Sequence, residues 1–289
     1  MAGKRHGKAP YRVLYSNDCA NTVCTISPFR GEGQSFRPEM LQATVDETAD
    51  SGVDVHLLQP VDGDVPYWKS RICPLDEHCR WFVDTYGVAP DGFLKYLLSG
   101  GDILGLFIER CRLRGQAPFV SLRLNDAHGK ENVYAPKGRA AGGLSHQVTR
   151  FYRENPHYRI GPDVKSWAQH VLNWAIPEVR NRKLGFVREI CEQYDIDGFE
   201  LDFMRHPPFF RPAETPLAER RKIMTSFCRQ ARESLDATGG GKHRWLCCRI
   251  PSRTSAHDAM GIDVRKMADA GVEMFNLCSS YCNCLAPPP

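Results

Sequence analysis

The residues best suited to chemistry lie in the segment 195–207, which reads DIDGFELDFMRHP. Side chains alternate between the two faces of a β-strand. Glu200 and Asp202 therefore share one face, roughly 7 Å apart, and the apolar residues around them share the other. Paired carboxyl groups can carry acid–base chemistry. The alternation therefore predicts that both acids of this strand point into the interior of the fold.

Two carboxyl groups on an inward face need nearby cations or a wet pocket, because an unpaired buried charge is costly. Arg123 and Arg249 fall on the matching faces of the expected neighbouring strands, and we expect them to flank Glu200 and Asp202. A second interpretation stays open, in which these groups form a buried ion-pair network that only fixes the interior. It applies more to Glu200, because Asp202 lies nearer the strand end where a barrel keeps its active site.

The segment 125–128 reads Asn-Asp-Ala-His and follows another expected strand. A carboxylate and an imidazole at a strand end suit proton transfer or the binding of sugar hydroxyls, so Asp126 is a third catalytic candidate. Asn and Asp also begin loops for structural reasons, and Asn17 and Asp18 are similar cases. The residues expected to bind substrate are Gln59, Trp68, Arg123, Asn125, His128, Arg205, Arg249 and Asn276. Local packing is the alternative role of an aromatic loop residue such as Trp68.

Short β-rich segments alternate with amphipathic ones along the chain. Strands are expected at 12–16, 53–59, 118–124, 197–203, 245–250 and 272–277. Helices are expected at 38–51, within 91–114, at 167–174, 177–194, 217–235 and 264–270. This alternation predicts parallel βαβ units, and the longest loops follow strands, as in a TIM-type (β/α) barrel. A doubly wound sheet is disfavoured, because the residues after the first strand, SNDCANTVC, lack its Gly-rich phosphate loop.

The expected strands number six, whereas a closed barrel of this type has eight. We therefore expect residues 1–289 to form a single glycosidase-like barrel domain that is incomplete, with about six of eight βα units and the C-terminal units missing. The first and last strands would each keep an unpaired edge. Self-association through these open edges is the expected consequence.

Bulk properties exclude several classes of partner. The net charge of +4 comes from scattered basic residues without a long basic run, which argues against nucleic-acid binding. Neither a secretory leader nor a stretch long enough to span a bilayer is recognisable, so a cytoplasmic location without a membrane partner is expected. The cysteines lie mostly in apolar segments and are expected to be buried thiols. Those at 278, 282 and 284 lack a CxxC pair or a partner histidine, so no metal is expected.

The segment from Asp197 to Pro207 resembles the DG-x-x-LD-x-x-R-x-P signature of bacterial glycoside-hydrolase-like barrels, relatives of the family-ten-like and α-amylase-type glycosidases. The segments 173–180 and 121–128 also look similar to that group. The likeness extends from Tyr11 to about Tyr281. It implies a (β/α)-barrel, and it implies that Asp202 is a catalytic carboxylate.

These observations favour a glycoside hydrolase that acts on an oligo- or polysaccharide, with Asp202 as one catalytic group and Glu200 or Asp126 as the second. A carbohydrate is the expected partner, and the chemistry requires no cofactor. The alternative is a non-catalytic carbohydrate-binding barrel, or an inactive fragment of a glycosidase. A metal-dependent barrel hydrolase is disfavoured, because the end of the first strand reads Tyr15-Ser-Asn-Asp18 instead of His-x-His.

Overall fold

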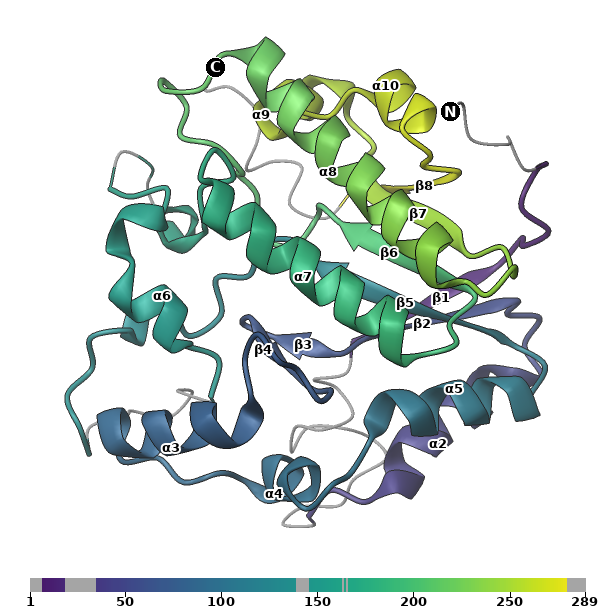
Figure 1. Ribbon diagram of the computed structural model, residues 1–289, viewed down its shortest axis with the longest axis horizontal. Coiled ribbons are helices and arrows are strands. Elements are labelled where there is room, and N and C mark those ends of the chain that lie inside the picture. Colours follow the sequence, from purple (N-terminus) through teal and green to yellow (C-terminus); the bar gives the residue numbers. More distant parts are fainter. Residues whose placement is uncertain (1–6, 19–34, 139–145, 163, 165, 280–289) are drawn as a thin grey trace.

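The computed structural model describes residues 7–18, 35–138, 146–162, 164 and 166–279. Six parallel strands in chain order form a curled half-barrel with helices outside it, an incomplete α/β barrel, which confirms the expected fold class (Figure 1). The strands are β1 (Leu14–Asp18), β2 (Val55–Gln59), β5 (Ala117–Arg123), β6 (Gly198–Asp202), β7 (Trp245–Pro251) and β8 (Met274–Cys278). The outer helices are α2 (Pro38–Ala49), α5 (Ile103–Leu113), α7 (Pro177–Gln193), α8 (Leu217–Thr238), α9 (His257–Met260) and α10 (Val264–Asp269).

Local signals set where several helices begin. Proline occupies the first position of α2 and of α7, where its missing N–H costs nothing. The Asp102 side chain caps α5 by accepting a hydrogen bond from the Gly105 N–H at 3.0 Å. In Figure 1, α7 and α8 run side by side across the sheet. None of the described helices is both long and apolar enough to cross a membrane.

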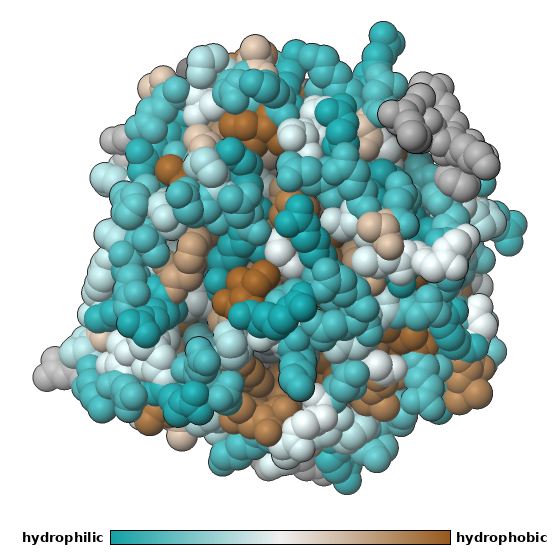
Figure 2. Space-filling model, in the orientation of Figure 1, coloured by the Kyte–Doolittle hydropathy of each residue, from teal (hydrophilic) through white to brown (hydrophobic). Residues whose placement is uncertain are grey.

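The two faces of the sheet differ as the period-two pattern predicts. Phe199 and Leu201 point to the helix layer and are fully buried in the main core. The inner face is apolar at the amino ends of the strands, where Val55, Leu57 and Phe119 form a second cluster. It is polar at the carboxyl ends. The outside of the helix layer is mainly hydrophilic, with apolar residues in small separate patches (Figure 2).

Gly198 makes the apolar floor possible. A Cβ atom at this position would lie 2.3 Å from two ring atoms of Phe119, closer than real contacts allow. The missing side chain lets the aromatic ring of β5 fill the interior in front of β6. The floor therefore closes the half-barrel at one end, and the polar groups gather at the other.

The connection between β2 and α5 contains structure that the sequence pattern did not predict. It holds a hairpin of β3 (Val61–Asp62) and β4 (Val65–Pro66), then α3 (Leu75–Tyr86), while α4 (Gly92–Leu98) lies with α5 in the helical region expected within 91–114. The connection between β5 and α7 holds the short helices η1 (Lys130–Asn132), α6 (Arg150–Glu154), η2 (Pro156–Tyr158) and η3 (Ser166–His170). Another short turn, η4 (Thr254–Ala256), follows β7. The hairpin strands are too short to show an alternating pattern, and no side chain caps the start of α3.

A buried ion cluster fastens the hairpin to the barrel. Asp64, in the hairpin turn, lies 2.5 Å from Lys183 Nζ on α7 and 3.6 Å from Lys130 Nζ. Lys183 also donates to the main-chain oxygen of Arg123 at 3.0 Å, and Lys130 donates to that of Gln147 at 2.9 Å. Both lysine side chains are at most 1% exposed, so their charges rely on these partners.

We predict that Lys183→Met destabilises the fold by about 3–5 kcal/mol, because the change leaves Asp64 buried with one cation fewer. Arg150→Met is the control. Its partner Glu154 lies one helical turn away and both side chains are largely exposed, so its loss should cost less than about 1 kcal/mol. Urea unfolding measures both free energies. Similar values for the two variants would contradict the role of the cluster.

The outer edges of the sheet generate a second prediction. Among the described residues, β1 and β8 each pair on one side only, and Leu277 of β8 is 68% exposed. Unpaired strand edges with apolar side chains favour edge-to-edge association. We predict concentration-dependent association in sedimentation velocity, and a lower associated fraction for Leu277→Lys. A monomer at all concentrations would refute this prediction.

Candidate functional site

A cavity of about 180 Å³ lies at the carboxyl ends of the strands. Strand register places Arg123, Asp202 and Arg249 level with one another on β5, β6 and β7. The residues that line the cavity are Ser16, Asp18, Gln59, Ser121, Arg123, Asp202, Met204, Arg205, Arg249 and Cys278. Five of them, at positions 59, 123, 202, 205 and 249, are candidates from the sequence.

Asp202 is buried, and it lines the cavity. Its Oδ1 atom accepts a hydrogen bond from the Met204 N–H at 2.8 Å, and within the described part of the chain Oδ2 accepts none. Burial raises the pKa of Asp202, although the charges of Arg249, Arg123 and Arg205 oppose the rise. A carboxyl group in this environment favours its protonated form, which suits a proton donor.

Glu200 lies beneath the cavity and is fully buried. Its two oxygens accept hydrogen bonds from Ser121 Oγ at 2.8 Å and Asn276 Nδ2 at 2.6 Å. Burial raises the pKa of Glu200, and the nearby Asp202 raises it further. Glu200 and Asn276 therefore form a hydrogen-bonded layer under the site, and neither is among the residues that line the cavity.

The arginines do not pair with the acids in the way the alternation predicted. Among the described residues, neither Arg123 nor Arg249 forms an ion pair with Glu200 or Asp202. Arg123 contacts Asp18 at the end of β1 and lies 3.4 Å from Asp126 Oδ2. The expected flanking positions are correct, but the direct contacts of Arg123 are with Asp18 and Asp126, and Arg249 acts on Glu200 and Asp202 only through its charge.

Asp18 is the second carboxyl group on the cavity wall; the sequence analysis noted it after the first strand but did not include it among the site candidates. The first strand was expected at 12–16, whereas β1 covers Leu14–Asp18. This displacement left Asp18 in the following loop. Asp18 lies two residues after Ser16, so on a strand their side chains share one face, and Ser16 also lines the cavity. A correctly predicted strand end would have revealed this.

Asp126 and His128 form a close pair beside the cavity. Asp126 Oδ1 lies 2.7 Å from His128 Nδ1 and accepts the His128 N–H at 2.9 Å. Arg205 Nη2 lies 2.6 Å from His128 Nε2. An arginine only donates, so Nε2 accepts this bond and the proton of the neutral ring is on Nδ1, facing Asp126. Burial opposes ionisation of Asp126, but His128, Arg123 and His206 together hold its pKa well below its usual range.

His206 joins this pair and was also not among the sequence candidates. Its ring packs edge-on against that of His128 at 4.7 Å, and its φ of +52° lies in the left-handed region that side chains rarely adopt. Donor atoms of Asp126, His128 and His206 lie within 4.8 Å of one another, close enough to hold a metal ion. Arg123 contacts Asp126 and Arg205 contacts His128. Positive charge therefore already lies beside two of the three groups and opposes the binding of a cation.

Two sequence candidates lie elsewhere. Asn125 is buried and uses its amide within the protein: its oxygen accepts from Trp174 Nε1 at 3.2 Å and its nitrogen donates to the Pro208 carbonyl at 3.0 Å. Trp68 donates to Glu189 of α7 at 3.0 Å. This local packing is the alternative noted for a loop aromatic.

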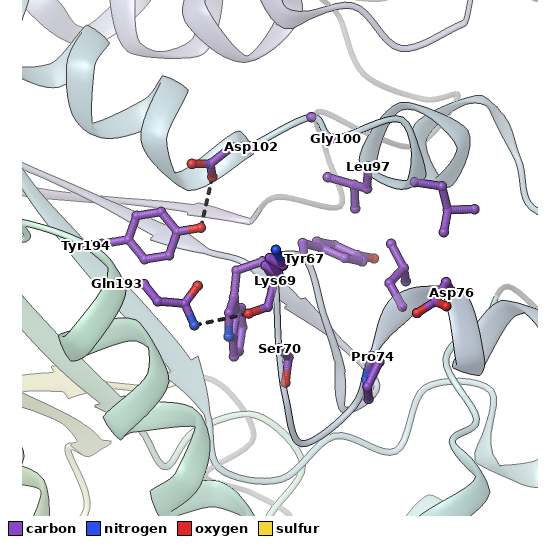
Figure 3. A pocket seen from close by; sticks show the side chains of 14 residues that line it. Tyr67, Lys69, Ser70, Pro74, Asp76, Leu97, Gly100, Asp102, Gln193 and Tyr194 are labelled. Carbon is purple, nitrogen blue, oxygen red and sulfur yellow. Dashed lines mark hydrogen bonds between the residues drawn. The ribbon is translucent and has the colours of Figure 1, made fainter.

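Trp68 lines a separate cavity of about 680 Å³ between the segment 67–76, α4 and the carboxyl end of α7. In Figure 3 the Tyr194 hydroxyl points to Asp102 and the Gln193 amide to Lys69, so groups on the cavity wall bind one another. A carboxyl group with a raised pKa, Asp202, and three arginines line the smaller cavity at the carboxyl ends of the strands, which makes that cavity the candidate functional site.

No family model matches the chain, and no curated protein matches it. Among solved structures, the chain is similar to the GH20 catalytic modules of a pneumococcal exo-β-D-N-acetylglucosaminidase, with 8% identity over 91% of this chain and 65% of that one, at a TM-score of 0.50. It is also similar to a PgaB glycoside hydrolase domain from Bordetella bronchiseptica, with 11% identity, 87% and 69% coverage and a TM-score of 0.47.

A maltogenic α-amylase from Thermotoga neapolitana has 14% identity and a TM-score of 0.42, over 82% of this chain and 45% of that one. The chain spans only 32% of an α-L-fucosidase from Paenibacillus thiaminolyticus and 28% of an α-galactosidase from Geobacillus stearothermophilus. At such low identity the likeness concerns the fold alone, and the similarity to the GH20 modules agrees with a (β/α)-barrel.

The buried Glu200 predicts a specific pH dependence of stability. A raised pKa means that the folded state keeps the proton longer, so stability is lost as pH rises from the unfolded carboxyl pKa, about 4.3, through the folded one. Glu200→Gln removes this titration. Its amide oxygen can accept from Asn276 and its NH₂ can donate to Ser121, so the shape is kept.

We therefore expect the free energy of unfolding of Glu200→Gln to fall less between about pH 4 and pH 8 than that of the wild type. Urea unfolding at several pH values measures the slope. Glu154→Gln on the exposed side of α6 is the control and should follow the wild type. A slope for Glu200→Gln as steep as that of the wild type would contradict burial of an ionisable group there.

Proposed function

We propose that the protein is a glycoside hydrolase that acts on an oligo- or polysaccharide, within a single barrel domain covering residues 1–289. The observation that carries this proposal is that two carboxyl groups, Asp18 and Asp202, line one cavity at the carboxyl ends of the strands. Active sites of (β/α) barrels are built at this end. The glycosidase-like fold adds support, although a fold by itself hosts many chemistries.

The surroundings of the two acids suit different roles. Asp202 has a raised pKa, and its Oδ2 accepts no hydrogen bond from the described residues, so it donates a proton to the glycosidic oxygen as that bond breaks. Asp18 contacts the guanidinium of Arg123, a permanent cation. Asp18 then acts either on a water molecule as the base or on the sugar carbon as the nucleophile. The distance between the reacting carboxyl groups distinguishes these two mechanisms.

The other two acids from the sequence analysis take supporting roles in this mechanism. Both oxygens of Glu200 are engaged below the cavity, so it positions the β6 strand end. Asp126 orients His128, which in turn contacts Arg205 on the cavity wall. Gln59, through its amide oxygen, and Arg205 are the cavity-wall groups that we assign to sugar hydroxyls.

A carbohydrate-binding protein without turnover is the second candidate. The observation that favours it is the contact between Arg123 and Asp18, because a carboxylate held by a guanidinium is a weaker base or nucleophile. In that case the cavity would bind sugars, and no glycosidic bond would be cleaved. Measurement of binding and of reducing-end release on the same glycans separates the two candidates.

We predict that Asp202→Asn lowers kcat by about 10²–10⁴-fold, because the amide keeps the shape and loses the proton. Asp195→Asn is the matched control: this exposed carboxylate precedes the other end of β6, and its loss should leave kcat within about twofold. Activity is measured on α- and β-linked 4-nitrophenyl glycosides and by reducing-end release, with thermal melts to verify folding. Near-normal turnover by a folded Asp202→Asn would exclude the proposed role.

A further inference from the structure

Arg249 differs from the other two arginines of the cavity wall: against the effect of burial, the charges of Glu200 and Asp202 raise its pKa, but among the described residues it has no contact partner. Arg123 contacts two carboxylates, and Arg205 contacts His128. Within the described part of the chain, the Arg249 side chain forms neither a hydrogen bond nor an ion pair, yet it lines the cavity. An arginine fork in a partly buried position without a partner is suited to a ligand with an anionic group, which it can bind with two parallel hydrogen bonds.

The charge of the cavity wall agrees with this assignment. Three arginines and two aspartates line it, and Asp126 behind the wall is a further carboxylate in contact with Arg123. These charges balance when all three aspartates are ionised, and one positive charge is in excess when Asp202 holds its proton. Such an excess is unusual for a site that binds only neutral sugars, because a positive wall attracts anionic ligands and a neutral hydroxyl gains little from it.

The position of Arg249 defines where the anionic group would lie. Arg249 is level with Asp202 on the adjacent strand, both residues line the same cavity, and Arg249 is the charge that most opposes the raised pKa of Asp202. An anion bound by Arg249 therefore lies in the same cavity as the proposed proton donor. We propose that the site takes an acidic sugar, one whose ring bears a carboxylate or a sulfate, and that Arg249 binds this group. The proposal deepens the proposed function, because it assigns a substrate class to the same cavity.

The test measures binding by isothermal titration calorimetry with the full chain. The probes are D-glucuronate, D-galacturonate and the 6-sulfates of glucose and galactose, each against its neutral parent sugar. We expect at least one acidic probe to bind about tenfold or more tightly than its parent, and the preference to weaken as salt is added. The carboxylate and sulfate arms show which anion the site prefers.

Arg249→Gln should reduce this preference by about tenfold or more, the size of a lost charge-assisted hydrogen bond. Arg253→Gln is the matched control: it removes the same charge from an exposed residue just after β7 that does not line the cavity. Its preference should equal that of the wild type. Arg249→Lys tests the fork itself and should restore only part of the preference.

Three results would overturn the inference: no binding of any acidic probe, equal binding of acidic and neutral sugars, or an unchanged preference in a folded Arg249→Gln. Hydrolysis of neutral glycosides together with any of these results would leave the proposed function standing. Acid-selective binding without cleavage of any glycoside would overturn the proposed function and sustain the inference. The two failures are therefore distinguishable.

Discussion

The contacts of Arg123 with Asp18 and Asp126 set the arrangement of the whole polar mouth. A guanidinium with only 7% of its side chain exposed requires paired charges, and its two partners come from β1 and from the loop after β5. Because β2 lies between these two strands, the contact with Asp18 spans the curl of the sheet. The main-chain oxygen of Arg123 also accepts a hydrogen bond from Lys183, so α7 depends on the same position.

The division between an apolar floor and a polar mouth then explains the chemistry of the cavity. Phe119 fills one end because Gly198 leaves it room, and this excludes water from below the acids. Glu200 and Asp202 consequently sit where ionisation is unfavourable, whereas Asp18 sits against a permanent cation. Two carboxyl groups in opposed surroundings are the basis of the proposed hydrolysis, and the arginines around them are the basis of the proposed acidic substrate.

Sequence reasoning located β6 and its two inward acids because a period-two pattern within one strand is a local property. It also placed Arg123, Arg205 and Arg249 around the mouth. It failed where the deciding interaction is distant in the chain: the burial of Lys183 is set by Asp64, 119 residues away. Trp68 was assigned to the site for the same reason, since its actual partner Glu189 is equally remote in sequence. Because the first strand was predicted two residues too early, Asp18 was assigned to the following loop and not to the site.

The cluster of Asp64, Lys130 and Lys183 has a consequence for the evolution of the chain. Each member makes the burial of the others tolerable, so replacement of any one alone leaves an uncompensated charge in the interior. Divergent descendants would retain all three or exchange them together for a well-packed apolar set. These three positions, far apart in the sequence and outside the proposed catalytic pair, should therefore be inherited as a unit.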